Sequence, residues 1–301
     1  MATTENYSSN YTGVQAMPYI APAVFGARSL SDTDPLVTIH ENVPGKLNVT
    51  NVDVGGNIVE DRTCDWSPSG TIDKSDTVLT VSPFQTQREM CFDNLYDQWE
   101  IMERRGQNIE GWVPTEFLDF VAMRLGKAVS KKMEQLLYIG DSGNANEFDG
   151  LLIKLGANDI QISSLTSAII VAELDKVRQA INDDVYVEDD FSIMLSIADM
   201  KKYQIAVQDG DYKNSGPIGQ VPQDFRGIPL KVAYGLPENK VIAGRASDLH
   251  FGTHMKSDIN EFGTKDMREF GESNLRMWAK YDAGTAVTNR TDIILADTTA
   301  V

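Results

Sequence analysis

The chain has 301 residues, of which 42% are hydrophobic and 24% charged, and its formal net charge is −17 at pH 7. A chain of this size and composition can bury a substantial core, in one elaborate domain or in two that are closely joined. The excess of acidic residues argues against a protein that reads nucleic acid, because phosphate binding depends on Lys and Arg.

Other classes of protein are disfavoured by the cysteines and the N-terminus. Cys64 and Cys91 form no CxxC pair and have no His at metal-ligand spacing, so we expect reduced thiols rather than a disulfide framework. Residues 1–7 are polar and the first basic residue is Arg28, so the early positive charge and the apolar run of a secretory signal are both lacking. The longest apolar stretch, residues 165–172, is too short to cross a membrane. We expect a protein that is made and used in a cytosol.

Residues 1–35 predict an extended arm. They are rich in Ser, Thr, Asn, Gly and Pro and show neither a helical nor a strand period. Their apolar content is too high for a solvated tail. The arm is therefore expected to lie on its own body or on a neighbouring molecule.

Residues 36–85 predict a long β-hairpin. Residues 36–40 and 77–81 are the strand candidates, and turn signals lie between them at 44–45, 55–56 and 67–70. A hairpin of this length has little core of its own and is marginal alone in water. It is therefore expected to need a partner surface, although the alternative, that arm and hairpin are ordinary surface excursions, stays open.

Residues 113–140 predict a long helix. Pro114 suits its start, acidic residues come early and lysines late, and Gly140 suits the position after its end. About 26 residues give a rod of about 39 Å. Apolar residues recur at three- and four-residue spacing and predict one buried face: Leu118, Val121, Leu125, Ala128, Val129, Met133 and Leu136.

The remainder of the chain alternates between helical and strand patterns, so the expected fold class is α+β. No internal repeat and no low-complexity tract is present. Helices are predicted over residues 166–183 and 198–208. Strands are predicted over residues 191–196, 228–233, 240–244, 274–282 and 292–295.

The histidines do not form a convincing metal motif. His250 and His254 have the i, i+4 spacing of helical zinc sites, but Gly252 stands between them and no Glu occupies the position that a metalloprotease needs. We therefore predict no metal site.

No other pattern predicts catalysis or cofactor binding. The sequence has no Gly-x-Ser-x-Gly elbow and no Walker A motif, and the glycines of residues 216–219 indicate a loop. The acidic pairs Asp183-Asp184 and Asp189-Asp190 are interpreted as solvated turns. No catalytic, cofactor-binding or metal residue is predicted, and this favours a structural or binding protein over an enzyme.

The order of these parts resembles the major capsid proteins of tailed bacteriophages, which have the Hong-Kong-97-type fold. An irregular arm and a long hairpin precede a long helix that ends in Gly140-Asp141-x-Gly143. Phe148-Asp149-Gly150-Leu151-Leu152 follows after a short gap. In that family the helix is the spine of a peripheral domain, and this passage leads into an axial domain.

The C-terminal third resembles the same family. Phe225-Arg226-Gly227-Ile228-Pro229-Leu230 is similar to its x-x-Gly-x-Pro-Val strand, and residues 235–244 follow in the expected order. Residues 248–253 are similar to a leucine-x-x-Gly element, and residues 276–287 to the last peripheral strand with an Ala-Gly turn. Each motif alone is weak, and the shared order carries the resemblance.

The resemblance implies a division of the chain. The expected parts are an N-terminal arm (residues 1–35), an extended hairpin loop (36–85), a peripheral domain (86–149 and 275–301) and an axial domain (150–274). The cross-link between a Lys and an Asn that joins subunits in some relatives is not implied, because Lys46 and Lys74 lie in the hairpin without a matching motif.

The resemblance also implies a function. The chain is expected to be a non-enzymatic shell protein that assembles through pentamers and hexamers into an icosahedral phage head, in the host cytoplasm and then in the virion. The expected partners are a portal, a decoration protein and, since the sequence starts at Met1 without a scaffolding segment, a separate scaffolding protein. An acidic wall encloses double-stranded DNA without binding it. The alternatives are an encapsulin-type compartment and, more distantly, an α+β enzyme.

Overall fold

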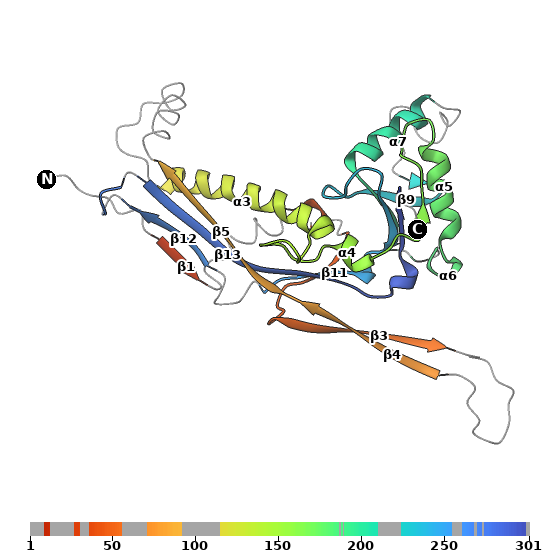
Figure 1. Cartoon of the computed structure of the whole chain (residues 1–301), viewed down its shortest axis with the longest axis horizontal. Coiled ribbons are helices and arrows are strands. Elements are labelled where there is room, and N and C mark those ends of the chain that lie inside the picture. Colours follow the sequence, from red (N-terminus) through yellow and green to blue (C-terminus); the bar gives the residue numbers. More distant parts are fainter. Residues whose placement is uncertain are drawn as a thin grey trace, which may run out of the picture.

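The computed structural model contains two six-stranded sheets, the helices that cover them and a projecting two-stranded hairpin (Figure 1). This mixed architecture confirms the α+β class predicted from the sequence. The structure describes residues 9–12, 27–30, 36–55, 71–91, 115–186, 188, 190–209, 224–254, 261–267, 270–272 and 274–298.

The first sheet is built around β13 and is called the β13 sheet. Its strand order is β1-β12-β13-β11-β2. β5 also pairs with β13, along the edge that faces away from β12. All pairs are antiparallel except β11 and β2, which are parallel. The bounds are β1 Ser9–Thr12, β2 Thr38–His40, β5 Ser82–Cys91, β11 Leu249–Gly252, β12 Glu261–Asp266 and β13 Asn274–Val287.

The long helix α3, Thr115–Ile139, lies along this sheet and confirms the helix predicted from the sequence (Figure 1). Its buried side chains share one core with alternate residues of β13, such as Met277 and Tyr281. Ala128 was expected on the buried face but is exposed. Pro114 and the side chains of Leu118 and Val121 lie outside the described residues. The predicted residues that are buried are Leu125, Val129, Met133 and Leu136.

The glycines at the end of α3 are required by close packing rather than by a left-handed cap. Gly140 follows the helix, as expected, but is not among the residues with positive φ. A Cβ on Gly140 would lie 2.3 Å from the Phe148 carbonyl oxygen, and one on Gly150 would lie 2.6 Å from that of Tyr138. Gly140 and Gly150 therefore let two backbone segments touch at the end of the helix.

The second sheet is built around β10 and is called the β10 sheet. Its order is β6-β14-β10-β7-β9-β8, with β7–β9 and β6–β14 parallel. Both faces are buried: Ile193 and Val241 pack beneath α5 and α7, whereas Met194 and Ile242 belong to the core that contains α3. The strands are β6 Ile160–Gln161, β7 Phe191–Leu195, β8 Asp224–Phe225, β9 Ile228–Val232, β10 Val241–Arg245 and β14 Ile294–Asp297.

The helices around the β10 sheet confirm the predicted pattern and correct its bounds. The helix expected over residues 166–183 is shorter, and a separate turn of helix begins at Asp183. Its predicted buried residues Ile170, Leu174, Val177 and Ile181 are all buried. The helices are α4 Leu151–Leu155, α5 Ile170–Ala180, α6 Asp183–Tyr186 and α7 Ile197–Asp209.

The last long strand runs further than the sequence predicts. The pair Ala283-Gly284 was interpreted as a turn, but it lies inside β13 and pairs with β5 and β11. A Cβ on Gly284 would lie 2.0 Å from the carbonyl oxygen of Thr80. The glycine therefore marks the crossing of another strand. The final strand, expected over residues 292–295, is displaced to β14 by a 3-10 turn at Arg290–Asp292.

The described parts of the N-terminal arm lie on the body of their own chain. Ser9–Thr12 forms β1, although no strand was expected in this region. Further on, Ser29 is buried against α3, where its backbone N–H donates to Glu134 (3.1 Å) and its hydroxyl accepts from Tyr138 (2.9 Å). Burial raises the pKa of Tyr138 far above its usual range, so the phenol remains a neutral donor.

Candidate functional site

The β3–β4 hairpin exposes most of the residues of its second strand. β3 (Lys46–Gly55) and β4 (Thr71–Thr80) pair in register over ten residues each and project away from both sheets (Figure 1). A hairpin was predicted within residues 36–85 and is present, but its first strand was misplaced. The expected strand 36–40 corresponds to β2, which pairs with β11 in the β13 sheet, and the partner of β4 is β3. Because side chains alternate along a strand, the hairpin has an inner and an outer face with different surroundings.

The inner face is seated on the β13 sheet by a small apolar cluster. Leu79 and Val81 are buried there with Val43 and Ala286. Beneath them Gly252 and Gly284 are register partners in β11 and β13. Their missing side chains make room, because a Cβ on Gly252 would lie 2.7 Å from Leu79 Cδ2, and one on Gly284 would meet the Thr80 backbone. This cross-strand glycine pair is called the glycine seat.

The outer face carries apolar side chains in solvent. Val52, Ile72 and Val78 are 56%, 73% and 49% exposed. Polar neighbours on the same face include the ion pair between Lys74 and Asp76 (3.1 Å). Exposed β-branched residues in a regular ladder, interleaved with charges, make a surface suited to contact with another protein.

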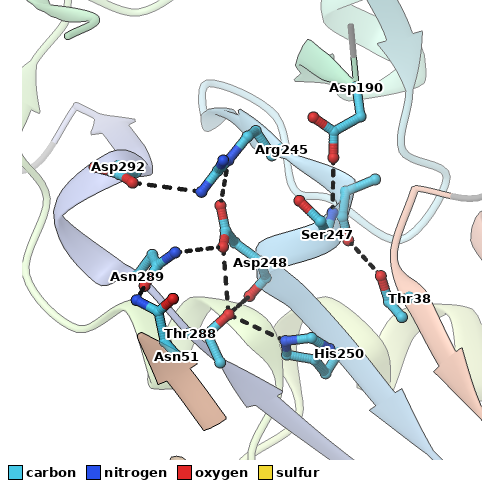
Figure 2. A network of polar contacts seen from close by, with 11 residues as sticks. Thr38, Asn51, Asp190, Arg245, Ser247, Asp248, His250, Thr288, Asn289 and Asp292 are labelled. Carbon is cyan, nitrogen blue, oxygen red and sulfur yellow. Dashed lines mark hydrogen bonds and ion pairs between the residues drawn. The ribbon is translucent and has the colours of Figure 1, made fainter. Parts of the chain in front are cut away.

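A buried polar cluster lies where the chain passes between the two sheets; this region is called the joint (Figure 2). One connection, Ala246–Asp248, leads from β10 to β11, and the other, residues 288–293, leads from β13 to β14. Asp248 is only 3% exposed and accepts hydrogen bonds from Arg245 Nε (2.8 Å) and Asn289 Nδ2 (3.0 Å). The pKa of Asp248 is raised above its usual value, because the effect of burial is larger than the opposing effect of the hydrogen bond from Arg245.

The joint also holds the hairpin. Asn51, on the inner face of β3, donates from its amide nitrogen to Oδ1 of Asn289. Figure 2 shows the hydrogen bonds that lead from Asn51 through Asn289 to Asp248. Arg245 lies on the other side of Asp248, and its Nη2 is 3.5 Å from Oδ2 of Asp292. The hairpin is thus fixed at the glycine seat and again at the joint.

A pair of histidines lies next to the joint. His40 Nε2 and His250 Nδ1 are 3.2 Å apart, and His250 Nε2 lies 3.1 Å from the Thr288 hydroxyl. Burial, and then the nearby His40, lower the pKa of His250 to about 4, and burial lowers the pKa of His40. In this hydrogen bond one ring must accept through an unprotonated nitrogen, so at least one of the two imidazoles is neutral.

The residues with potential for chemistry do not come together. His250 lies in β11, whereas His254 forms an isolated bridge with Asn42 beyond the strand. Asp190 is exposed and accepts from the backbone of Ser247 (3.2 Å), as a turn residue would. In the part of the chain that the structure describes, no group of three His, Cys, Asp or Glu side chains is suited to a metal ion.

The remaining candidates are placed only in part. Cys91 is a free, half-buried thiol. Cys64, Asp189, residues 216–219 and the side chain of Asp184 lie outside the described residues. None of the described helices is both long and apolar enough to cross a membrane.

Several solved structures of phages and capsid particles have a similar fold. The capsid of the native GTA particle aligns with a TM-score of 0.59 at 10% identity, over 93% of this chain and 91% of that chain. A structure of Microbacterium phage Oxtober96 aligns with a TM-score of 0.55 at 12% identity, over 99% and 96%. The chain has a tailed-phage capsid fold. The virus-like particle from Pyrococcus furiosus shares this capsid fold at a TM-score of 0.51 and 13% identity, over 95% and 99%.

The capsid fold thus confirms the Hong-Kong-97-type architecture that the order of motifs predicted. The sequence matches no protein-family model and no curated protein. The division into arm, hairpin loop, peripheral and axial parts stays a prediction.

Sequence reasoning missed the joint. Its members come from residues 38–51, 245–250 and 288–292, which are far apart in the chain, and no spacing rule connects them. The left-handed conformation of Asn289, with φ 41°, is visible only in the structure, although Asn is enriched in that region of backbone space.

Proposed function

We propose that the chain is the major capsid protein of a tailed double-stranded DNA bacteriophage, which self-assembles into an icosahedral head shell and has no enzymatic role. The observation that carries the proposal is the hairpin. Its two ten-residue strands leave the body with core support only at their base, and they expose Val52, Ile72 and Val78. Such an element gains its stability by lying on another copy of the chain.

The parts of the shell subunit follow the division predicted from the sequence. Residues 1–35 form the arm, 36–85 the extended loop, 86–149 and 275–301 the peripheral domain, and 150–274 the axial domain. Support comes from the separate core beneath α5 and α7, which is drawn largely from the proposed axial part. The loop reaches over the next subunit within and between pentamers and hexamers.

Other partners follow from the shell function. A separate scaffolding protein, a portal and a decoration protein act with the shell, which assembles in the host cytoplasm and remains in the virion. One similar structure is described as a satellite phage P4 procapsid that includes a size determination protein, so such shells are solved with helper proteins. The net charge of −17 suits a wall that encloses DNA without binding it.

The test of the proposal is negative-stain electron microscopy of the protein, expressed alone and with its neighbouring genes. Uniform closed shells, or rings of five and six subunits, support it. Monomers or small dimers in both samples contradict it. Shells that enclose a cargo enzyme and lie beside its gene, rather than beside portal and terminase genes, favour the encapsulin alternative.

A matched pair of variants tests the role of the outer face. Ile72→Lys places a charge on the outer face, whereas Thr71→Lys places it on the inner face one residue away, where Thr71 is already exposed. We expect Ile72→Lys to abolish or strongly reduce closed shells while the folded subunit persists, and Thr71→Lys to assemble. Equal assembly of both variants contradicts the proposed contact.

A further inference from the structure

The hairpin has an attachment to the body beyond its apolar base, and it passes through one side-chain amide. Asn51 donates to Asn289 Oδ1, and Asn289 Nδ2 donates to the buried carboxylate of Asp248 at 3.0 Å. Both ends of the Asn289 amide are therefore used, one toward the hairpin and one toward the joint (Figure 2). Removal of this amide breaks the bridge and leaves the glycine seat intact.

The residue type at position 289 is specified twice. Its backbone has φ 41° and ψ 55°, a left-handed conformation that glycine and Asn adopt more readily than other residues. Its side chain must both accept and donate. Glycine satisfies only the first condition, and Asp would lose the donor and place a second carboxylate beside Asp248.

The far end of the bridge is buried and held by several hydrogen bonds. Asp248 is 3% exposed, its second carboxylate oxygen accepts from Arg245 (2.8 Å), and its carbonyl accepts from the backbone N–H of Thr288 (2.9 Å). It stands in the short 3-10 turn between β10 and β11, so it belongs to the connection between the two sheets. The hairpin is therefore bonded to the connection that joins the two sheets.

We propose that Asn289 is a positioning residue, a latch that fixes the angle of the β3–β4 hairpin against the joint. In a shell, and so resting on the proposed function, this angle decides where each hairpin meets the next copy and therefore the curvature at which the shell closes. Through the latch, a change in the angle of the hairpin is coupled to a change in the angle between the two sheets.

Hydrogen exchange of the unassembled chain tests the latch independently of any shell. Asn289→Gly keeps the backbone conformation and removes both hydrogen bonds of the bridge, whereas Asn51→Ser removes the one to the hairpin. In both variants we expect amides of residues 51–55 and 71–75 to exchange about tenfold faster. Asn48→Ser, on the outer face of the same strand, is the matched control and leaves these rates unchanged.

A charge swap separates positioning from general stability. In Asn289→Asp the new carboxylate at position 289 repels that of Asp248. In the double variant Asn289→Asp, Asp248→Asn the amide at position 248 donates to the carboxylate at position 289, so one hydrogen bond between the two positions is restored. We expect the single variant to exchange as fast as Asn289→Gly and the double variant to return toward the parent rate. Unchanged hairpin exchange in the single variants, or faster exchange in β7 and β10 as well, overturns the latch.

Assembled particles test the consequence for the shell. We expect Asn289→Gly shells to spread over several diameters in electron micrographs, and the swap variant to restore one diameter. A single parental diameter in Asn289→Gly, with the hairpin loosened in exchange, overturns the link between the latch and curvature. Absence of shells from the parent chain counts against the proposed function instead, and the exchange rates still judge the latch.

Discussion

The β10 sheet and the β3–β4 hairpin are built from similar β-branched residues but obtain their stability in different ways. In β7 every residue is buried, since both faces of the sheet are covered. In β4 only Leu79 is buried, and Ile72, on the other face of the strand, is 73% exposed. The β10 sheet is therefore stabilised within the chain, whereas the hairpin depends on a surface that the chain alone does not supply.

The largest effect is expected from the same substitution made in the two regions. Ile193→Ala removes a fully buried side chain from β7 and should lower the free energy of unfolding by about 3–4 kcal/mol. Ile72→Ala removes an exposed side chain from β4 and should change it by less than about 0.5 kcal/mol. Urea unfolding of the unassembled chain measures both, and similar losses in the two variants would show that the hairpin is stabilised within the chain as the β10 sheet is.

The next effect depends on pH and concerns His250, beneath the hairpin base. Its pKa in the folded chain, about 4, lies below the usual 6.5 because of burial and of His40. The unfolded chain therefore takes up a proton first, and stability that is present above about pH 6.5 is lost as the pH falls toward about 4, by up to about 3 kcal/mol.

Unfolding midpoints of the parent and His250→Gln, measured across that range, check this expectation. Gln keeps a donor and an acceptor but does not titrate, so the variant should lose most of this slope. Parallel slopes in the two proteins would show that other groups govern the response to acid.

The glycine seat should show a smaller, graded effect. Gly284→Ala forces a Cβ against the Thr80 backbone, which cannot turn aside, and should lower stability by about 2 kcal/mol. Gly252→Ala meets first the end of the Leu79 side chain, which can rotate, and should lower it by about half as much. Hydrogen exchange of β3 and β4 should rise in the same order, and the reverse order would contradict the crossing described here.

The smallest effect is expected at the edge of the β10 sheet. The turn between β8 and β9 has Arg226 at φ 50° and Gly227 at φ 90°, where Asn-Gly is the preferred pair. Arg226→Asn should raise stability by at most about 1 kcal/mol, since the gain is offset by loss of the exposed ion pair with Asp175. Asp175→Asn alone measures that offset, and a net loss in Arg226→Asn larger than this offset would contradict backbone strain.

Much of the fold was predictable because it depends on local patterns. The spacing in α3 and the continuous apolar run of β7 each follow from burial of one face or both faces. The order of weak motifs predicted the capsid fold, although no motif alone is specific.

The rest depends on contacts between distant residues. Gly284 was mistaken for a turn because its reason, the passage of Thr80 across β13, lies about 200 residues away in the sequence. β11 was not predicted as a strand, since its mixed residues His250, Phe251 and Gly252 gain their order from pairing with β2 and β13. The joint was invisible for the same reason.

The glycine seat has a mechanical consequence. A hairpin strand of ten residues is a lever about 33 Å long, with the seat as its fulcrum and Asn51 near its midpoint. A force on the tip produces a torque at Gly284, within a strand that is paired on both edges along much of its length. The load therefore spreads into the β13 sheet as a whole, while the bending of the lever is confined to the half beyond Asn51.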